Sequence, residues 1–178
     1  MERKSEEYGL VYTTLPPYEV LTTKWLDYDR VLELKTIENM VEIYYNSRQF
    51  TNALAWLENQ FETPFKMFEG IGKYYELHKL NEVKHNRIQM YEILLEYVKS
   101  VCEDYKVFEE LLKLDVYLRE NIKSRPAFAG DNHKEELRDY YHEYRSEGKN
   151  IHIELFNINI RKWINNRTIE QTEQVVMF

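Results

Sequence analysis

The chain has 178 residues, 43% of them hydrophobic and 31% charged, which is typical of one globular domain and excludes a disordered chain. Its net charge of -7 repels phosphate backbones, so no nucleic-acid partner is expected. Residues 2–7 are charged where a signal peptide needs apolar residues, and no apolar run approaches the roughly 20 residues that span a bilayer. We therefore expect no membrane partner. The single cysteine, Cys102, excludes an intramolecular disulfide and favours a cytoplasmic location.

Tyrosine is unusually abundant, with 15 residues beside 8 Phe and 3 Trp. Its side chain combines a large apolar ring with one polar tip. Two interpretations remain open at this point. The rings could form an aromatic core whose hydroxyl groups reach the surface, or they could form an aromatic interface with another domain or a ligand.

The first 26 residues are expected to form a linker and lead-in. Residues 2–8 favour a short polar helix that Gly9 could end, and residues 10–14 are extended in character. The pair Pro16-Pro17 then blocks a helix and stiffens the turn.

Aromatic residues follow this diproline. A rigid turn followed by Tyr18 and Trp25 is typical of a segment that is pinned against a surface. That surface could be the core of this domain or a neighbouring domain.

Residues 27–148 show the three- and four-residue apolar spacing of amphipathic helices. Residues that favour helix starts precede most of these segments, as Asp27 and Thr63-Pro64 do. The expected helices cover residues 27–46, 51–61, 63–80, 86–102, 104–119 and 132–148. The last of them has few apolar residues and is expected to lie on the surface. Gly70 and Gly72 fall inside the third helix with no strand before them, so they indicate close helix packing and not a dinucleotide-binding loop.

After Gly148 the apolar residues alternate with a period of two, from Ile151 to about Ile160, and this pattern predicts a strand. Residues 175–178 are apolar and also favour a strand. A small antiparallel β-element is therefore expected near the C-terminus, and residues 10–12 could join it.

The predicted fold class is mainly α, with about six amphipathic helices in an orthogonal or irregular bundle and this small antiparallel β-element. We expect a single domain over residues 1–178, with the lead-in at 1–26, the bundle at 27–148 and the β-element at 149–178. Because the chain stops on four apolar residues, we expect it to be a fragment of a longer polypeptide.

The sequence shows no motif for catalysis, for cofactor binding or for metal binding. No His-x3-His pair occurs, and a polar break separates His78 from His85. His133 and His142 are nine residues apart, and no Gly-x-Ser-x-Gly turn is present. Cys102 is expected to behave as a small buried hydrophobic residue. We therefore assign no catalytic, cofactor-binding or metal-binding residue.

One basic segment stands out in this acidic chain, since Arg119, Lys123 and Arg125 fall within seven residues where a helix is expected to end. Cations at that position favourably oppose the helix dipole. Alternatively, Arg119 or Arg125 could form forked hydrogen bonds to a carboxylate or phosphate. The candidate inter-domain or anion contacts are therefore Arg119, Lys123 and Arg125, together with Tyr18 and Trp25.

Several segments carry a resemblance to a known family. They are Tyr8-Gly9-Leu10-Val11-Tyr12, Pro16-Pro17-Tyr18-Glu19-Val20-Leu21, Lys24-Trp25-Leu26, Met40-Val41-Glu42 with Tyr44-Tyr45-Asn46-Ser47, Pro64-Phe65, Arg87 with Tyr91-Glu92, and Asp115 with Leu118-Arg119-Glu120-Asn121 and Lys123-Ser124-Arg125-Pro126-Ala127-Phe128. Together they resemble the C-terminal helical domain, of unknown function, of cobalamin-binding radical SAM proteins.

This resemblance implies a parent enzyme with a cobalamin-binding domain and a radical SAM barrel. The barrel would hold a [4Fe–4S] cluster through Cys-x3-Cys-x2-Cys and cleave S-adenosylmethionine, with methyl transfer as the favoured reaction. The present chain has neither these cysteines nor an Asp-x-His-x2-Gly cobalamin motif, so no cofactor residue is carried over to it. It would be a non-catalytic accessory domain whose partners are the barrel and cobalamin-binding domain of the same parent chain. The alternative is a free-standing helical module that binds another protein.

Overall fold

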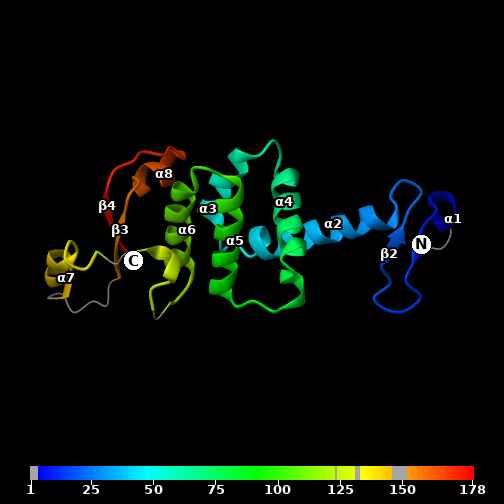
Figure 1. Ribbon diagram of the computed structural model, residues 1–178, viewed down its shortest axis with the longest axis horizontal. Helices are drawn as coiled ribbons and strands as arrows, with labels where there is room; N and C mark the ends of the chain where they lie inside the picture. The colour runs from blue at the N-terminus through cyan, green and yellow to red at the C-terminus, as the bar shows by residue number, and fades with distance from the viewer. Residues whose placement is uncertain (1–3, 123, 131–132, 146–151) are drawn as a thin grey trace.

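The computed structural model describes residues 4–122, 124–130, 133–145 and 152–178 and confirms a mainly helical fold. In chain order its principal elements are α1 (Ser5–Tyr8), β1 (Val11–Tyr12), β2 (Val20–Thr22), α2 (Tyr28–Met40), a π-helical segment (Val41–Asn46), α3 (Thr51–Leu57), α4 (Pro64–Leu77), α5 (Arg87–Val101), α6 (Tyr105–Arg119), α7 (Arg138–Arg145), β3 (Ile153–Phe156), α8 (Ile160–Asn166) and β4 (Gln174–Met177). Short 3-10 turns lie at Glu58–Gln60, Leu80–Glu82 and Ala127–Ala129. In Figure 1 the molecule is elongated, with α3 to α6 in the middle, the N-terminal hairpin at one end and the C-terminal β-element at the other.

Local capping explains where several helices begin. The Asp27 side chain accepts a hydrogen bond from the Arg30 amide at the start of α2, and Asn86 and Gln89 form a reciprocal capping box at the start of α5. Thr63 caps α4 in the same way. Asp104 was also expected to cap a helix, but although it directly precedes α6 its side chain makes no capping bond. Its backbone is not extended as a capping residue usually is, so the carboxylate is not directed at the free amides.

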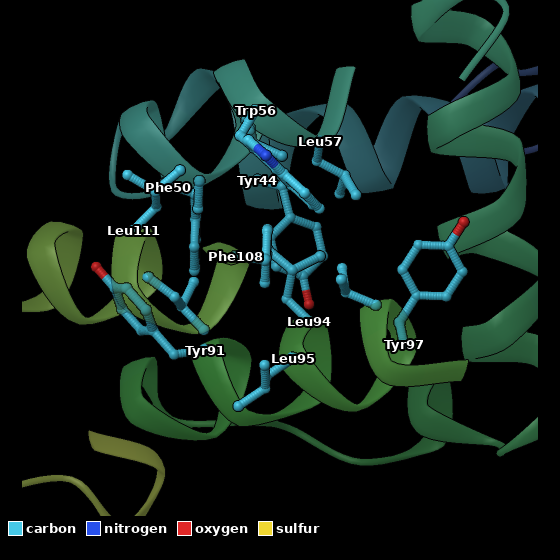
Figure 2. Packing of buried hydrophobic residues seen from close by; sticks show 14 of the residues in the cluster. Tyr44, Phe50, Trp56, Leu57, Tyr91, Leu94, Leu95, Tyr97, Phe108 and Leu111 are labelled. Atoms are coloured by element: carbon cyan, nitrogen blue, oxygen red, sulfur yellow. The ribbon is translucent and has the colours of Figure 1, made fainter. Parts of the chain in front are cut away.

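Aromatic rings fill the core of the bundle, as Figure 2 shows for Tyr44, Phe50, Tyr91 and Phe108. The Tyr44 hydroxyl lies 2.7 Å from the Tyr75 hydroxyl, and burial raises the Tyr44 pKa well above its usual value. The Tyr91 hydroxyl donates to the Gln49 carbonyl at 3.2 Å. The aromatic-core interpretation is therefore correct for these tyrosines, but their hydroxyl groups find partners inside the protein instead of reaching the surface.

The two glycines of α4 permit close helix contacts, as expected. A Cβ atom on Gly72 would lie 2.9 Å from the Thr36 Cγ2 atom of α2. A Cβ atom on Gly70 would lie 2.3 Å from the Tyr97 hydroxyl oxygen of α5. Glycine at these two positions therefore lets α4 approach one neighbouring helix on each side.

The Gly70→Ala substitution is expected to lower the free energy of unfolding by about 1–3 kcal/mol, because the Tyr97 ring must move. In a Tyr97→Phe background the same substitution should be tolerated, since the clashing oxygen is gone and alanine favours a helix over glycine by up to about 1 kcal/mol. Urea unfolding of the four proteins measures both effects. An equal cost in both backgrounds would show that the Tyr97 hydroxyl is not the obstacle.

Two sequence-based expectations about strands are wrong. Residues 10–12 do not join the C-terminal β-element, because β1 pairs with β2 in an antiparallel hairpin while β3 pairs with β4. The strand predicted to continue to Ile160 ends at Phe156. Three residues after Phe156, the Asn159 side chain accepts a hydrogen bond from the Lys162 amide and starts α8. This helix buries Ile160 and Trp163.

The sixth expected helix is shorter than predicted. Helix α7 begins at Arg138, after a turn over residues 134–137, because His133 has a positive φ of 44° that interrupts regular helix geometry. Its expected limits, Asn132 and Gly148, lie outside the described residues. Within the described part of the chain, no helix is long and apolar enough to cross a bilayer.

Candidate functional site

The N-terminal arm, which we define as residues 4–36, extends from the bundle (Figure 1), and only the end of its helix α2 packs on α4, where the Thr36 hydroxyl donates to Glu76 at 2.8 Å. It comprises α1, the β1–β2 hairpin and most of α2. Gly9 has a left-handed φ of 56° and ends α1, and the Lys24 amide then donates to the Tyr8 carbonyl at 2.8 Å. The rings of Tyr8 and Trp25 lie 5.8 Å apart. These local contacts hold the arm together.

Large apolar side chains of the arm are exposed. The exposed fraction is 74% for Leu15, 70% for Tyr18 and 69% for Trp25. The other exposed large apolar residues of the arm are Val11, Tyr28, Leu32 and Leu34. Among the described residues, the buried core begins only at Ile37. Tyr18 and Trp25 are thus not pinned against the core of this domain, and their apolar surface is open to a partner.

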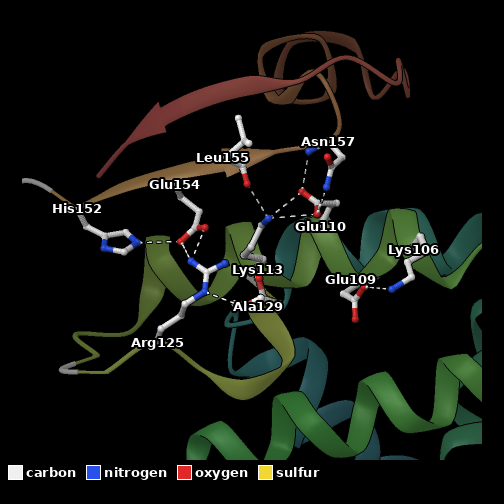
Figure 3. A network of polar contacts seen from close by, with 11 residues as sticks. Lys106, Glu109, Glu110, Lys113, Arg125, Ala129, His152, Glu154, Leu155 and Asn157 are labelled. Atoms are coloured by element: carbon white, nitrogen blue, oxygen red, sulfur yellow. Dashed lines mark hydrogen bonds and ion pairs between the residues drawn. The ribbon is translucent and has the colours of Figure 1, made fainter. Parts of the chain in front are cut away.

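The basic segment lies far from these two aromatic residues. Arg119 is exposed at the end of α6, and Lys123 lies outside the described residues. Arg125 points toward β3, at the end of the molecule opposite the arm (Figures 1 and 3). The structure therefore does not bring the four described contact residues, Arg119, Arg125, Tyr18 and Trp25, together into one site.

Arg125 forms forked bonds to a carboxylate, but that carboxylate belongs to the same chain. Its Nη1 group donates to both oxygens of Glu154, whose side chain has no exposed surface. Its other donors reach the Ala129 and Gly130 carbonyls, while His152 lies 3.1 Å from Glu154 (Figure 3). Burial opposes ionisation of Glu154, but the bonds from His152 and Arg125 prevail and lower its pKa to about 2.

A buried cation, Lys113, also fastens β3 to α6. The Lys113 Nζ atom donates to the Leu155 carbonyl at 2.8 Å and to Glu110 at 3.1 Å, and it lies 4.5 Å from the centre of the Phe156 ring. Glu110 also accepts from the Asn157 amide at 3.1 Å. Sequence reasoning missed both Lys113 and Glu154. The available signal was a charged residue within an apolar run of a predicted helix or strand.

A third network joins α6, α3 and α8. The fully buried Asp115 carboxylate accepts from the Asn52 backbone amide at 2.9 Å, from its side-chain amide at 2.8 Å and from the Ala53 amide at 2.8 Å. The Asn52 side-chain oxygen accepts from Trp163 at 3.0 Å and Arg167 at 2.8 Å. Burial raises the Asp115 pKa to about 6, although these amides favour the charged form. All of these polar groups serve to hold helices together.

Over residues 6–178, the chain matches the model of a protein family described as "Protein of unknown function (DUF4080)". This chain belongs to the DUF4080 family. No curated protein and no solved structure matches it.

The described part of this DUF4080 chain contains no group of three or more His, Cys, Asp or Glu residues placed to hold a metal ion. Cys102 was expected to be buried, but it is only half-buried. Its partial burial raises the pKa of its thiol. The charged groups of the three networks already bind one another. Among the described residues, the arm carries exposed large apolar side chains, including Leu15, Tyr18 and Trp25, that are available to a macromolecular partner.

Proposed function

We propose that this chain is the non-catalytic C-terminal accessory domain of a cobalamin-binding radical SAM enzyme, and that its N-terminal arm docks on the radical SAM barrel. In this role it would help to shape the substrate site and to exclude water from radical intermediates. The catalytic groups, the [4Fe–4S] cluster, S-adenosylmethionine and cobalamin would all belong to the rest of the parent, for which methyl transfer is the favoured reaction.

The observation that carries this proposal is the exposure of Leu15, Tyr18 and Trp25 on an arm outside the core. A two-stranded hairpin is marginally stable alone in water, and it gains stability when its apolar face packs on another surface. Aromatic residues of this kind are typical anchors of protein interfaces, where truncating one often costs about 2 kcal/mol or more.

The sequence supports the choice of partner. The arm contains the segments Tyr8–Tyr12, Pro16–Leu21 and Lys24–Leu26, and these segments carry the first part of the resemblance to radical SAM proteins. Three of the exposed apolar residues of the arm, Val11, Tyr18 and Trp25, are therefore among those that the resemblance rests on. A docking role explains why apolar residues would be placed there, since they add nothing to the core of this domain.

Amide hydrogen exchange tests the proposal. The 178-residue chain is compared with the full-length product of its open reading frame, with exchange followed at residues 11–22. Docking is expected to slow exchange in the hairpin at least tenfold, because a buried hairpin must open before its amides exchange. The double substitution Leu15→Ser/Tyr18→Ser, which spares the contact between Trp25 and Tyr8, should restore fast exchange in the full-length protein while leaving the isolated chain as stable as before.

A matched control alters two exposed apolar residues of the bundle. Tyr45 is 64% exposed and Leu77 is 77% exposed, so Tyr45→Ser/Leu77→Ser removes similar residues from another surface. This control should leave protection of the hairpin unchanged. The proposal is wrong if the reading frame encodes no Cys-x3-Cys-x2-Cys barrel, or if the hairpin exchanges equally fast in both proteins.

A second candidate function uses the same exposed surface. The chain could be a free-standing interaction module whose arm binds a separate protein. A native start codon at Met1 and a native stop codon after Phe178 would favour this function over the first.

A further inference from the structure

A hollow of about 500 Å³ lies where α7 approaches the start of β3, and the arm has no part in it. Sites for small organic ligands commonly have volumes of about 300–1,000 Å³. The described residues that line it are mostly cationic or imidazole side chains, with one aromatic ring and one aliphatic chain. They are Arg125, Lys134, Arg138, His142 and His152, together with Tyr141 and Ile153.

The two walls of this pocket are held together by specific contacts. The Tyr141 hydroxyl donates to the Ile153 carbonyl at 3.0 Å, and the Ile153 amide lies 3.4 Å from the same hydroxyl oxygen. Leu137 is buried against Ile153 and Leu155 in a small second apolar cluster. The hollow is therefore bounded by packed elements and is not a gap between unconnected loops.

The cations of the α7 wall come from one face. Lys134, Arg138 and His142 are spaced four residues apart, and Arg138 and His142 therefore lie on the same side of α7. Within the described part of the chain, Lys134 makes no ion pair. Arg138 makes one long contact there, 3.5 Å, to the exposed Asp139 carboxylate.

The opposite wall is electrically balanced. Arg125 is bound by the buried Glu154, and His152 hydrogen-bonds to the same carboxylate. The positive charge available to a ligand in the pocket thus comes mainly from Lys134 and from Arg138, whose contact with the exposed Asp139 is long and weak. In a chain with a net charge of -7, this positive charge would attract a small anion, whereas the rest of the surface would repel a polyanion.

We propose that this pocket binds a small phosphate monoester. The phosphate group lies between Lys134 and Arg138, and the organic group lies against Tyr141 and Ile153. A phosphate monoester carries a charge of about -1.5 to -2 near neutral pH, which matches two cations better than a carboxylate does. The hollow is also far larger than a phosphate ion, and its Tyr141–Ile153 side offers apolar surface for the attached group.

Isothermal titration calorimetry at constant ionic strength tests this inference on the 178-residue chain. The ligands are phenyl phosphate, inorganic phosphate and benzoate. Phenyl phosphate is expected to bind at one saturable site, at least threefold more tightly than inorganic phosphate and tenfold more tightly than benzoate. The double substitution Lys134→Gln/Arg138→Gln should weaken the binding of phenyl phosphate at least tenfold.

The matched control is Lys84→Gln/Arg161→Gln, which removes two exposed cations away from the pocket with the same change of net charge. It should bind phenyl phosphate as tightly as the unmodified 178-residue chain does. Thermal unfolding should show that both double variants are folded. Equal weakening by the two double variants would show only a general charge effect and would overturn the inference. Equal affinity for benzoate or for inorganic phosphate would overturn the assignment to a phosphate monoester. Because the isolated chain is used, the result is independent of the proposed docking of the arm.

Discussion

Replacement of Arg125 by alanine is expected to lower the free energy of unfolding by about 3–5 kcal/mol. Glu154 is fully buried, and Arg125 donates to both of its carboxylate oxygens. Without the guanidinium group, the carboxylate would lose its two bonds to a fixed cation and keep only weaker neighbours such as His152, which lies 3.1 Å away, in a site from which water is excluded. The loop at residues 124–130 would also lose its bonds through Ala129 and Gly130. Urea unfolding measures the loss directly.

Two further variants separate this buried pair from a general effect of charge. Arg119 is the same type of residue, but it is exposed, so Arg119→Ala should change the free energy of unfolding by no more than about 0.5 kcal/mol. The double substitution Arg125→Met/Glu154→Leu removes both charges and should recover much of the lost stability, because apolar residues can replace a buried ion pair. If Arg125→Ala lowers the free energy of unfolding no more than Arg119→Ala does, the ion pair with Glu154 does not stabilise the fold. Arg125 would then again be a candidate inter-domain residue.

Replacement of Asp115 by alanine is expected to cost about 3 kcal/mol or more. The carboxylate accepts from the backbone amides of Asn52 and Ala53 at the start of α3 and from the Asn52 side chain. Each buried donor left without a partner costs about 1–3 kcal/mol. Thr51→Ala, which changes an exposed residue at the same helix end, is the matched control and should cost less than half as much. Comparable losses in the two variants would contradict the assignment of Asp115 as the capping group of α3.

Asp115 also predicts a pH dependence with a definite sign. Its pKa is about 6 in the folded chain against 3.8 without burial, so between these values the folded state holds a proton that the unfolded state releases. The contribution of Asp115 to stability therefore falls as pH rises from about 4 to about 6, by at most roughly 1.4 kcal/mol per pH unit. Above about pH 6, the contribution of Asp115 to stability no longer changes with pH.

The Asp115→Asn variant isolates this effect, because asparagine does not titrate. The stability difference between the original chain and Asp115→Asn should shrink with rising pH between about 4 and 6 and then stay level. Glu154 acts in the opposite direction at lower pH, since its pKa near 2 means that stability is lost as pH falls below about 4.5. A difference that stays constant between pH 4 and 6 would show that Asp115 does not titrate in this range.

Much of the helical layout could be predicted from sequence because helix starts are local. Asp27, Thr63 and Asn86 each bond to an amide three residues ahead, so a short window contains the whole cause. The strand prediction failed beyond Phe156 for a related reason. Ile158 and Ile160 fit a period of two, but Asn159 starts a helix instead, and the burial of Trp163 three residues after Ile160 favours that outcome.

The roles of the polar residues needed the tertiary structure. The sequence selected Arg125 for its charge, yet its partner Glu154 is 29 residues away. The partner of Asp115, Asn52, is 63 residues away. The four-residue spacing of Lys134, Arg138 and His142 was visible in the sequence. The sequence did not show that β3 lies beside these residues and closes a pocket with them.

The sequence by itself determined the mainly helical class and most of the helix starts, because helical period and capping depend on neighbours along the chain. It left open whether the tyrosines fill the core, and the tertiary structure decided that they do. Only the tertiary structure decided that Tyr18 and Trp25 lie on a separate arm, that Arg125 binds Glu154 and that the cations of α7 face a pocket. These outcomes depend on how the elements pack. Packing brings together residues whose separation along the chain carries no information about their distance in space.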